Sequence, residues 1–320
     1  MRILNFFFLI FLFILIINFY YQKIFSFYAL KNDLIIEIPK GTNLNKITKI
    51  LLKKKIIQEG FFFKSWVKFN GLEKKLKAGE YLIENKINLN NLMHKLVNGK
   101  SVVHFLRIDD GVSKYALSKK IKKDIPRVRE FSHSFLPDNI ISDTYGYTIN
   151  DSLESLIKNF VIISNARAND IWMRRDKKIP LKSIDDLFII ASIIEKETGK
   201  KGEKKTIAGV FYNRLKKNMR LQSDPTVIFS LTNGGDFNRE LTKNDLKNKS
   251  IYNTYVVKGL PPSPICYPSL SSLEAAAKPE NTSFLYFVAD GSGGHFFAKS
   301  YKEHLRNIKK FKNAKKKKIE

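Results

Sequence analysis

The feature that most constrains the fold of this chain is an almost wholly apolar run, 187–194, which stops abruptly at the polar segment 195–199. The run is long enough for about two turns of helix and is apolar on nearly every side. A helix of that kind has to be buried. The sequence therefore predicts a core helix whose last turn carries two carboxylates, Glu195 and Glu197, into or beside the core.

Signals at both ends define this helix. Ser183 is followed three residues later by Asp186, which resembles a capping box with Asp in place of the usual Glu or Gln. Gly199 is placed to end the helix in a left-handed conformation. A second helical pattern, 207–215, follows, and we expect it to pack against the first helix.

The two glutamates are candidates for acid–base chemistry. At about 100° per residue, Glu195 falls beside Phe188, and Glu197 falls beside Ile190. A carboxyl group against apolar side chains is desolvated, so its pKa rises and it can hold a proton near neutral pH, as a general acid at a glycosidic oxygen must. The alternative is that both glutamates form salt bridges with nearby lysines. Helix position alone does not choose between the two residues or between the two interpretations.

A set of motifs around this helix resembles a known family. ASIIEKETG, FYNRL, MRLQSDPTV, YNTY, GLPPSPI and FLYFVADGSGGHFF occur in the order and spacing of the endolytic murein transglycosylase family, also called YceG-like. The similarity extends from about Leu34 to the region of Phe311. In that family the first glutamate of EKET is the catalytic one, so the resemblance implies that Glu195 is catalytic, while a change at Glu197 is expected to affect mainly stability or rate.

The resemblance also implies the reaction. It is cleavage of the MurNAc–GlcNAc β-1,4 bond within a peptidoglycan strand, leaving a 1,6-anhydro-MurNAc end, with a role in terminating or releasing nascent strands. Protonated Glu195 would donate to the glycosidic oxygen and then remove the proton of the sugar's own 6-hydroxyl, so one carboxyl group suffices. Neither a metal nor a cofactor is expected. Departures from the family pattern at Asp110, Ser142 and Ser269 motivate an alternative, an inactive membrane-tethered adaptor that binds peptidoglycan.

Four residues are candidates for substrate binding. Gln222 is an amide in a short loop after the acid helix, where it is costly unless it binds something. Asp224 also has a structural explanation, as the N-cap of a helix whose first residue is Pro225. Asn253 and Tyr255, in the YNTY element, combine an amide with an aromatic ring, which suits sugar recognition. A further aromatic residue in a family motif, Tyr145, is either a stacking platform for a sugar ring or a buried structural tyrosine.

The N-terminus has the composition of a membrane anchor. The run 3–21 is apolar and aromatic apart from Asn18, and its 19 residues suffice to cross a bilayer. A cleaved signal peptide is the alternative, but an A-x-A site is missing before Ala29. We predict a single-pass transmembrane helix over 1–22 in the cell inner membrane, with the N-terminus cytoplasmic and the catalytic domain periplasmic.

The remaining chain predicts an α+β fold with a small LysM-like α/β subdomain at 33–107 and a larger mixed α+β catalytic domain at 108–310. The stretch GTNLNKITKIL resembles the LysM-like part of the family, which implies glycan binding; a spacer is the alternative. A lysine-rich tail, 311–320, ends the chain, and we expect disorder from Lys309 onward.

The expected partners are peptidoglycan strands, the membrane and, by family association, peptidoglycan synthases. The formal charge of +27 is large, and 46 of the 57 basic residues are lysines. These lysines are scattered and accompany no nucleic-acid-binding motif, so we do not expect nucleic acid as a partner.

Overall fold

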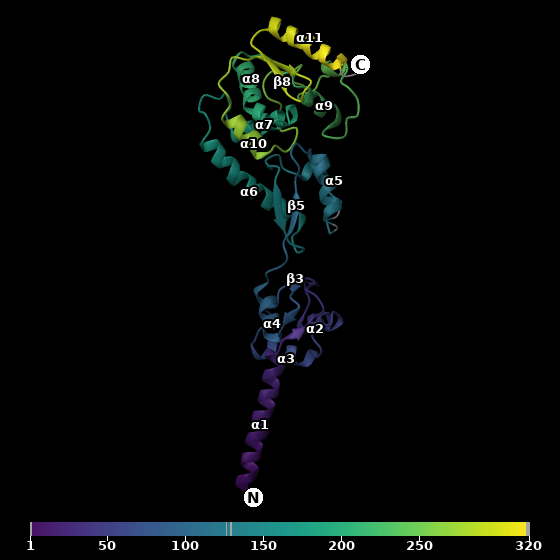
Figure 1. Ribbon diagram of the computed structural model, residues 1–320, viewed down its shortest axis with the longest axis vertical. Coiled ribbons are helices and arrows are strands. Elements are labelled where there is room, and N and C mark those ends of the chain that lie inside the picture. The colour runs from purple at the N-terminus through teal and green to yellow at the C-terminus, as the bar shows by residue number, and fades with distance from the viewer. Residues whose placement is uncertain (1, 126, 129, 318–320) are drawn as a thin grey trace. The chain divides into compact units, whose positions relative to one another are not determined.

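The computed structural model describes residues 2–125, 127–128 and 130–317, and its helices and strands form an α+β fold, as predicted (Figure 1). The chain divides into two compact units. The first contains residues 1–105 and 146–151, and the second contains residues 106–145 and 152–320. The interpretation of residues 33–107 as LysM-like and of 108–310 as catalytic stays a prediction.

The first unit is built from four helices and two antiparallel strand pairs, β1 with β4 and β2 with β3. Their bounds are α1 Arg2–Phe25, β1 Tyr28–Ala29, β2 Leu34–Ile38, α2 Leu44–Lys53, α3 Gly60–Phe69, β3 Gly79–Ile83, β4 Lys86–Ile87 and α4 Leu89–Asn98. The side chains of Asn43 and Asn88 cap α2 and α4 by accepting from backbone N–H groups. Strand β5, His104–Arg107, pairs with β6, Thr144–Tyr147.

Helix α1 is the one helix in the described part of the chain that is long and apolar enough to cross a membrane. Its side chains from Ile3 to Ile17 are exposed, which in water would be a large unfavourable apolar surface. Its last turns belong to the first unit's core, because Ile24 is fully buried and the Tyr20 hydroxyl lies 2.6 Å from Ser65 Oγ. This helix indicates single-pass membrane anchoring, and its last turns pack into the core of the first unit.

The second unit is mainly helical and carries the predicted acid helix at its centre. Its elements are α5 Lys114–Asp124, α6 Leu153–Met173, α7 Ile184–Glu197, α8 Lys204–Lys216, α9 Asp224–Thr232, α10 Leu270–Ala277, β7 Tyr286–Ala289, β8 His295–Ala298 and α11 Tyr301–Lys317, with short 3-10 turns at His133–Phe135, Lys201–Glu203 and Asp245–Lys247.

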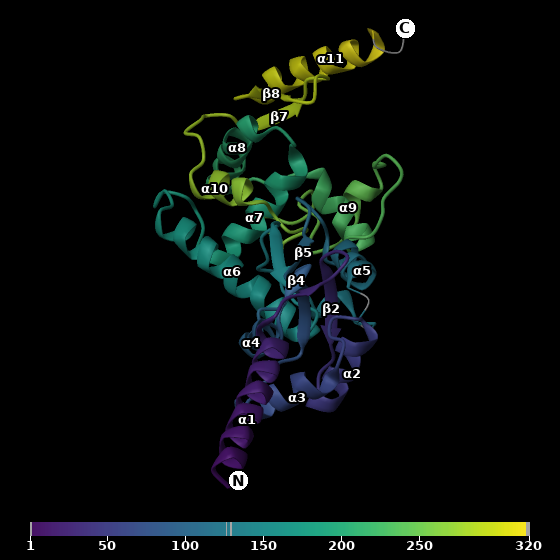
Figure 2. The same ribbon diagram turned by 60° about the horizontal axis from the view of Figure 1, so that its bottom comes forward.

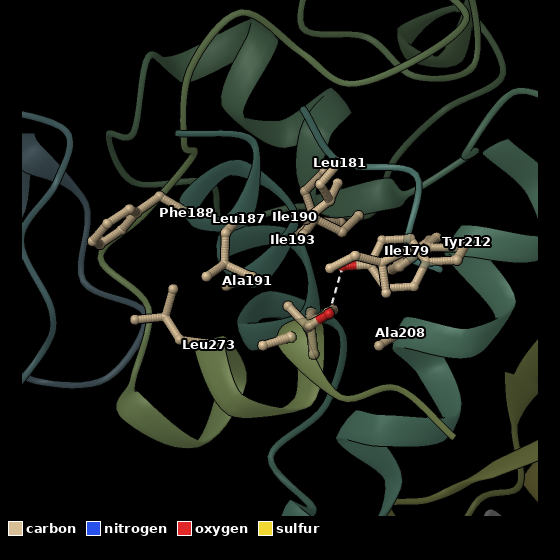
Figure 3. Packing of buried hydrophobic residues seen from close by; sticks show 14 of the residues in the cluster. Ile179, Leu181, Leu187, Phe188, Ile190, Ala191, Ile193, Ala208, Tyr212 and Leu273 are labelled. Atoms are coloured by element: carbon tan, nitrogen blue, oxygen red, sulfur yellow. Dashed lines mark hydrogen bonds between the residues drawn. The ribbon is translucent and has the colours of Figure 1, made fainter. Parts of the chain in front are cut away.

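The core of this unit forms around α7, as the apolar run predicted. Every residue from Leu187 to Ile194 is buried, and α8 and α10 pack against the helix (Figure 3). Tyr212 of α8 lies in this core and donates its hydroxyl to the Ala276 carbonyl at 2.6 Å. Gly209 allows α8 to approach the following chain closely, because a Cβ there would lie 2.6 Å from the Glu280 carbonyl oxygen.

The predicted start of α7 is confirmed, and its predicted end is wrong. The capping box is confirmed, since Ser183 Oγ accepts from the Asp186 N–H at 3.1 Å and the Asp186 carboxylate accepts from the Ser183 N–H at 3.2 Å. The prediction for Gly199 is wrong, because the helix ends at an extended Thr198 and Gly199 does not take a left-handed conformation. The Thr198 hydroxyl accepts from the Lys200 N–H at 3.0 Å and closes the turn in place of the glycine.

The C-terminal region forms a hairpin covered by a helix. Strands β7 and β8 pair antiparallel, as predicted, and α11 lies along them (Figure 2). The predicted disorder from Lys309 onward is wrong up to Lys317, where α11 ends, and residues 318–320 lie outside the described residues. The helix is stabilised by its apolar side, which includes Ile308 and Phe311, and by Asn307, which donates to the Phe297 carbonyl.

Two buried side chains complete the core. Tyr145 is a structural tyrosine and not a sugar platform, because its hydroxyl is buried and donates to the Ile141 carbonyl at 2.7 Å. Cys266, the chain's single cysteine, is buried and donates its thiol to the Ser192 carbonyl at 3.3 Å. Burial raises the pKa of this thiol far above its ordinary value.

Candidate active site

The last turn of α7 places Glu195 in a closed polar cluster. Its side chain is 7% exposed, and it forms an ion pair at 3.0 Å with Lys204, whose side chain is 4% exposed. The carboxylate also accepts from the Ser269 N–H at 2.8 Å, from the Ser269 hydroxyl and from the Ser272 hydroxyl at 2.7 Å. A lysine salt bridge is the alternative that the sequence left open for both glutamates, and Glu195 forms such a salt bridge.

The charge state of Glu195 differs from the prediction. Burial pushes the pKa of this carboxyl up, but the hydrogen bonds from Ser269 and Ser272 and the Lys204 ammonium outweigh burial, and the pKa lies below its ordinary value. The prediction of a raised pKa at Glu195 is therefore wrong. Its oxygens are occupied by donors from within the fold, and the group is held as a carboxylate.

Glu197 has the opposite environment. Burial is the largest influence on its carboxyl and raises the pKa to about 7, helped by the nearby Asp224 charge and opposed by Ser223 and Arg214. The Ser223 hydroxyl donates to Glu197 Oε1 at 2.5 Å. A carboxyl group with this pKa is protonated in about half of the molecules at neutral pH, which is the property that the sequence predicted for Glu195.

Glu197 also lines a cavity of about 540 Å³, a volume in the usual range of ligand sites. Three of the four predicted substrate-binding residues, Gln222, Asp224 and Tyr255, line the same cavity. The β7–β8 hairpin and α11 supply much of the remaining wall, including His295. The structure thus brings these three predicted binding residues to Glu197.

Asp224 and Tyr255 form a pair at the cavity wall. The Tyr255 hydroxyl donates to Asp224 Oδ1 at 2.6 Å. Burial, followed by the Asp224 carboxylate, raises the pKa of the phenol, so it stays protonated. The predicted N-cap is one residue off, because Ser223 precedes α9 and Asp224 is its first residue. Asp224 therefore keeps its carboxylate for Tyr255 and for the cavity.

Gln222 is held in place by its backbone and by an arginine. Its φ of +53° lies in the left-handed region, which is rare for a residue other than glycine. Its N–H donates to the Thr254 carbonyl at 3.1 Å, and its Oε1 accepts from Arg214 at 3.1 Å. Arg214 also donates to the Leu285 carbonyl at 2.6 Å, so one buried guanidinium links the Gln222 loop to the segment before β7.

The structure does not support the predicted role of Asn253. Its side chain is fully buried and does not reach the cavity. Its amide donates to the carbonyls of Leu246 and Asn248, and its Oδ1 accepts from the Tyr255 N–H at 2.9 Å. Every polar group of this side chain is therefore used to shape the loop that presents Tyr255, and its role in substrate binding stays a prediction.

Sequence reasoning missed a pair at the cavity, His295 and Glu203. The imidazole Nδ1 lies 2.8 Å from Glu203 Oε2, and Glu203 Oε1 accepts from the His295 N–H at 3.2 Å. A carboxylate at Nδ1 keeps the proton on that nitrogen and leaves Nε2 as an acceptor when the ring is neutral. The GGH triplet was visible as part of a family motif, but Glu203 lies 92 residues earlier, in a lysine-rich segment without a distinguishing pattern.

Together these features define a class, an anchored α+β protein whose larger unit carries a cavity with one carboxyl group suited to proton transfer. Comparison with known proteins identifies the family. The model of the YceG-like family matches residues 36–310, and the chain belongs to this family.

Named relatives agree with this assignment. An endolytic murein transglycosylase of Bacillus subtilis is 32% identical over 318 residues, which cover 89% of this chain and 86% of that protein. One from Streptococcus pneumoniae D39 is 26% identical, and the match covers 89% of this chain but 59% of the pneumococcal protein. The crystal structure of a YceG-like protein from Listeria monocytogenes aligns with a TM-score of 0.53 at 32% identity, over 87% of this chain and 99% of that one. The resemblance seen in the sequence motifs is confirmed.

Proposed function

We propose that this protein is an endolytic lytic transglycosylase of peptidoglycan, which cleaves the MurNAc–GlcNAc β-1,4 bond within a glycan strand and leaves a 1,6-anhydro-MurNAc end. Its family and the name of its Bacillus subtilis relative support the reaction. The observation that carries the proposal is the Glu197 carboxyl, with a pKa of about 7, in the wall of a cavity of about 540 Å³.

We further propose Glu197, and not Glu195, as the proton donor. The resemblance favoured the first glutamate of the EKET motif, but that residue is a buried carboxylate bound by a lysine and two serines. A general acid needs a proton to give and a path to the substrate. Glu197 has both, because its pKa is about 7 and its side chain lines the cavity.

The reaction balances with this one group. Glu197 donates its proton to the glycosidic oxygen, the bond from that oxygen to C1 of MurNAc breaks, and the sugar becomes oxocarbenium-like. The Glu197 carboxylate then takes the proton of the 6-hydroxyl, whose oxygen bonds to C1 and closes the anhydro ring. The hydroxyl is part of the same sugar, so its high effective concentration favours ring closure over attack by water. Glu197 ends the cycle protonated.

The other cavity residues suit the remaining tasks. The Asp224 carboxylate provides negative charge close to Glu197, where the sugar becomes positive. The Gln222 amide supplies N–H donors for sugar oxygens, and the Tyr255 ring supplies an apolar face for a pyranose. His295, fixed by Glu203, offers an acceptor for a substrate hydroxyl or amide N–H.

A matched pair of variants on one helix turn tests this assignment. The full-length protein with Glu197→Gln is expected to release anhydro-ended fragments from purified sacculi at least about 10²-fold more slowly, while keeping its fold. Glu195→Gln should act through the stability of the second unit, with product formation reduced in proportion to the folded fraction. Mass spectrometry of the products distinguishes the two. A folded Glu197→Gln protein with undiminished anhydro products would refute the assignment.

The departures from the family pattern at Asp110, Ser142 and Ser269 do not support the hypothesis of an inactive adaptor. Ser142 donates to Asp110 Oδ1 at 2.8 Å, and Ser269 binds Glu195. These substitutions are therefore used in contacts within the fold and do not alter the wall of the cavity that holds Glu197. Wild-type protein that binds sacculi without releasing anhydro ends would favour the adaptor.

We also propose the cell inner membrane as the location, with a cytoplasmic N-terminus, a periplasmic catalytic domain at 108–310 and a LysM-like subdomain at 33–107. The apolar surface of α1 supports the anchor, and the proposed substrate supports the orientation. Peptidoglycan synthases are proposed partners. Reporter fusions at the two termini test the orientation, and a reporter active in the cytoplasm at the C-terminus would exclude it.

A further inference from the structure

The first unit contains a cavity of about 470 Å³ that the proposed reaction does not use. It lies where α1 ends and is lined by residues of that helix, by the chain that follows it, and by the segment between α2 and α3. Phe19 and Phe27 contribute apolar surface, while Gln22, Lys23 and Lys55 contribute polar donors. The lining is thus apolar and cationic at once.

The depth of this cavity follows from the anchor. A helix crosses the hydrocarbon core of a bilayer in about 20 residues, and the apolar run of α1 covers residues 3–21. Residues from Gln22 onward therefore reach the level of the lipid headgroups. A cavity lined by Phe19, Gln22 and Lys23 opens at that level.

Rigid packing keeps the cavity at this depth. The ring of Phe25 meets Trp66 of α3 edge-on at 5.6 Å, and Tyr20 lies 5.7 Å from the ring of Phe62. Together with the buried Ile24 these contacts fix α3 against the end of α1. The headgroup level of α1 is therefore also the level of α3.

Exposed aromatic side chains mark the same level. Phe27 is 64% exposed, Phe61 is 67% exposed and Phe69 is 80% exposed. Large apolar side chains at such exposure are costly in water and are enriched at the membrane–water interface. They occur immediately after α1 and on α3, so a bilayer surface would cover them.

The charge of the cavity selects among lipids. Lys55 is exposed, and it follows Lys53 and Lys54 in sequence, which are exposed as well. Lys23 is bonded to Glu59 at 3.0 Å, which offsets part of its charge. The local balance stays positive, and ammonium groups beside a membrane attract anionic headgroups.

We infer that this cavity binds the phosphate headgroup of an anionic phospholipid, and that α3 rests on the bilayer surface. The lysines and glutamines face the phosphate and glycerol, and the surface of Phe19 and Phe27 takes the start of an acyl chain. The inference rests on the anchoring part of the proposed function and is independent of the transglycosylase reaction.

Native mass spectrometry of the full chain in detergent tests lipid selection. One phosphatidylglycerol molecule is expected to bind about tenfold more tightly than one phosphatidylcholine molecule. The double variant Lys23→Gln/Lys55→Gln should remove this preference. The matched control Lys74→Gln/Lys100→Gln changes two exposed lysines that do not line the cavity and should keep the preference. Equal binding of the two lipids, or equal effects of the two double variants, would overturn the inference. Displacement of the lipid by millimolar inorganic phosphate would also overturn it, because the site would then serve a free anion.

A second measurement tests the depth of α3. In a Trp172→Phe background, Trp66 is the remaining tryptophan, and brominated phosphatidylglycerol in nanodiscs should quench its fluorescence. Unquenched Trp66 would refute the surface position.

Two variants separate the lipid site from the reaction. Glu197→Gln should bind lipid like the wild type, and Lys23→Gln/Lys55→Gln should release normal anhydro products in detergent. Failure of the reaction is therefore distinguishable from failure of the lipid site. Recovery of the full chain in the soluble fraction after carbonate extraction would overturn the anchor and the inference together.

Discussion

The surroundings of Glu195 and of Glu197 differ more than their positions on α7 suggest. The two carboxyls lie two residues apart on one helix turn. The first is enclosed by Lys204, Ser269 and Ser272, and the second accepts a hydrogen bond from Ser223 and lines a cavity. The pKa of the first lies below its ordinary value, and the pKa of the second is raised to about 7. Burial acts on both, so the number of donors decides which carboxyl keeps its proton.

The difference shows how one helix turn can combine a structural charge with a reactive acid. Acid–base roles are assigned where the environments of neighbouring carboxyls move their pKa values apart. Glu195 holds the end of α7 to α8 and to the start of α10 through Lys204 and Ser272. That attachment supports the turn on which Glu197 faces the cavity.

The largest effect is expected on stability, when the ion pair between Glu195 and Lys204 is broken. Glu195→Gln leaves the Lys204 ammonium buried without its counter-charge and should destabilise the second unit by about 3–5 kcal/mol. Denaturation of the full chain in detergent can be followed by Trp172 fluorescence in a Trp66→Phe background. The double variant Glu195→Gln/Lys204→Met removes both charges and should regain much of the loss. If Glu195→Gln unfolded at the wild-type denaturant concentration, the ion pair would have no structural role.

A smaller effect, with a defined sign, concerns pH. The folded-state pKa of Glu197 is about 7 and lies above its ordinary value of 4.5, so the folded state holds the proton more tightly than the unfolded state in this window. Wild-type stability should therefore fall as pH rises from about 4.5 to about 7, by up to about 3 kcal/mol. Glu197→Gln lacks this titration, so the difference in unfolding free energy between the two proteins should grow over the window. A constant difference would show that the pKa of Glu197 is not raised.

A further prediction concerns Glu203, which holds His295 in the wall of the cavity that Glu197 lines. Glu203→Gln removes the charged acceptor at His295 Nδ1 while keeping the shape of the side chain. We expect kcat/KM on soluble glycan strands to fall about tenfold, mostly through a higher KM, since a hydrogen bond to a charged group contributes about 1.5–3 kcal/mol. A purely structural role would instead lower unfolding stability and leave KM unchanged.

The smallest expected effect is at Tyr255. Tyr255→Phe keeps the ring that faces the cavity and removes the hydroxyl that donates to Asp224. The loss of one hydrogen bond at a partly exposed pair is expected to change kcat/KM about fivefold. Tyr255→Ala also removes the ring and serves as the comparison. Equal losses for the two variants would assign the whole contribution to the hydroxyl.

Local rules predicted much of the fold. The apolar run gave the position of α7, Ser183 and Asp186 gave its start, and turn residues gave the β7–β8 hairpin. The end of α7 was missed because the Thr198 hydroxyl replaces the glycine signal. The helix α11 was missed because its apolar positions are separated by a dense series of lysines.

The choice between the two glutamates was beyond the sequence for a physical reason. A helical wheel places both beside apolar residues, but their pKa values depend on donors distant in the chain. Ser269 and Ser272 lie 74 and 77 residues after Glu195. Lys204 is one lysine in a lysine-rich segment, and its burial has no local signature. The surroundings of Asn253 were unpredictable for a different reason, since its amide donates to the backbone carbonyls of Leu246 and Asn248, whose positions depend on the conformation of its own loop.

The enclosed sulfur of Cys266 has a practical consequence. Its thiol is buried and donates to the Ser192 carbonyl, and burial raises the pKa of the thiol so that it does not ionise. Maleimide reagents added to intact cells would therefore leave the natural chain unlabelled. A cysteine introduced at a chosen surface position would be the one reactive handle, so sidedness across the bilayer could be mapped residue by residue without first removing a native thiol.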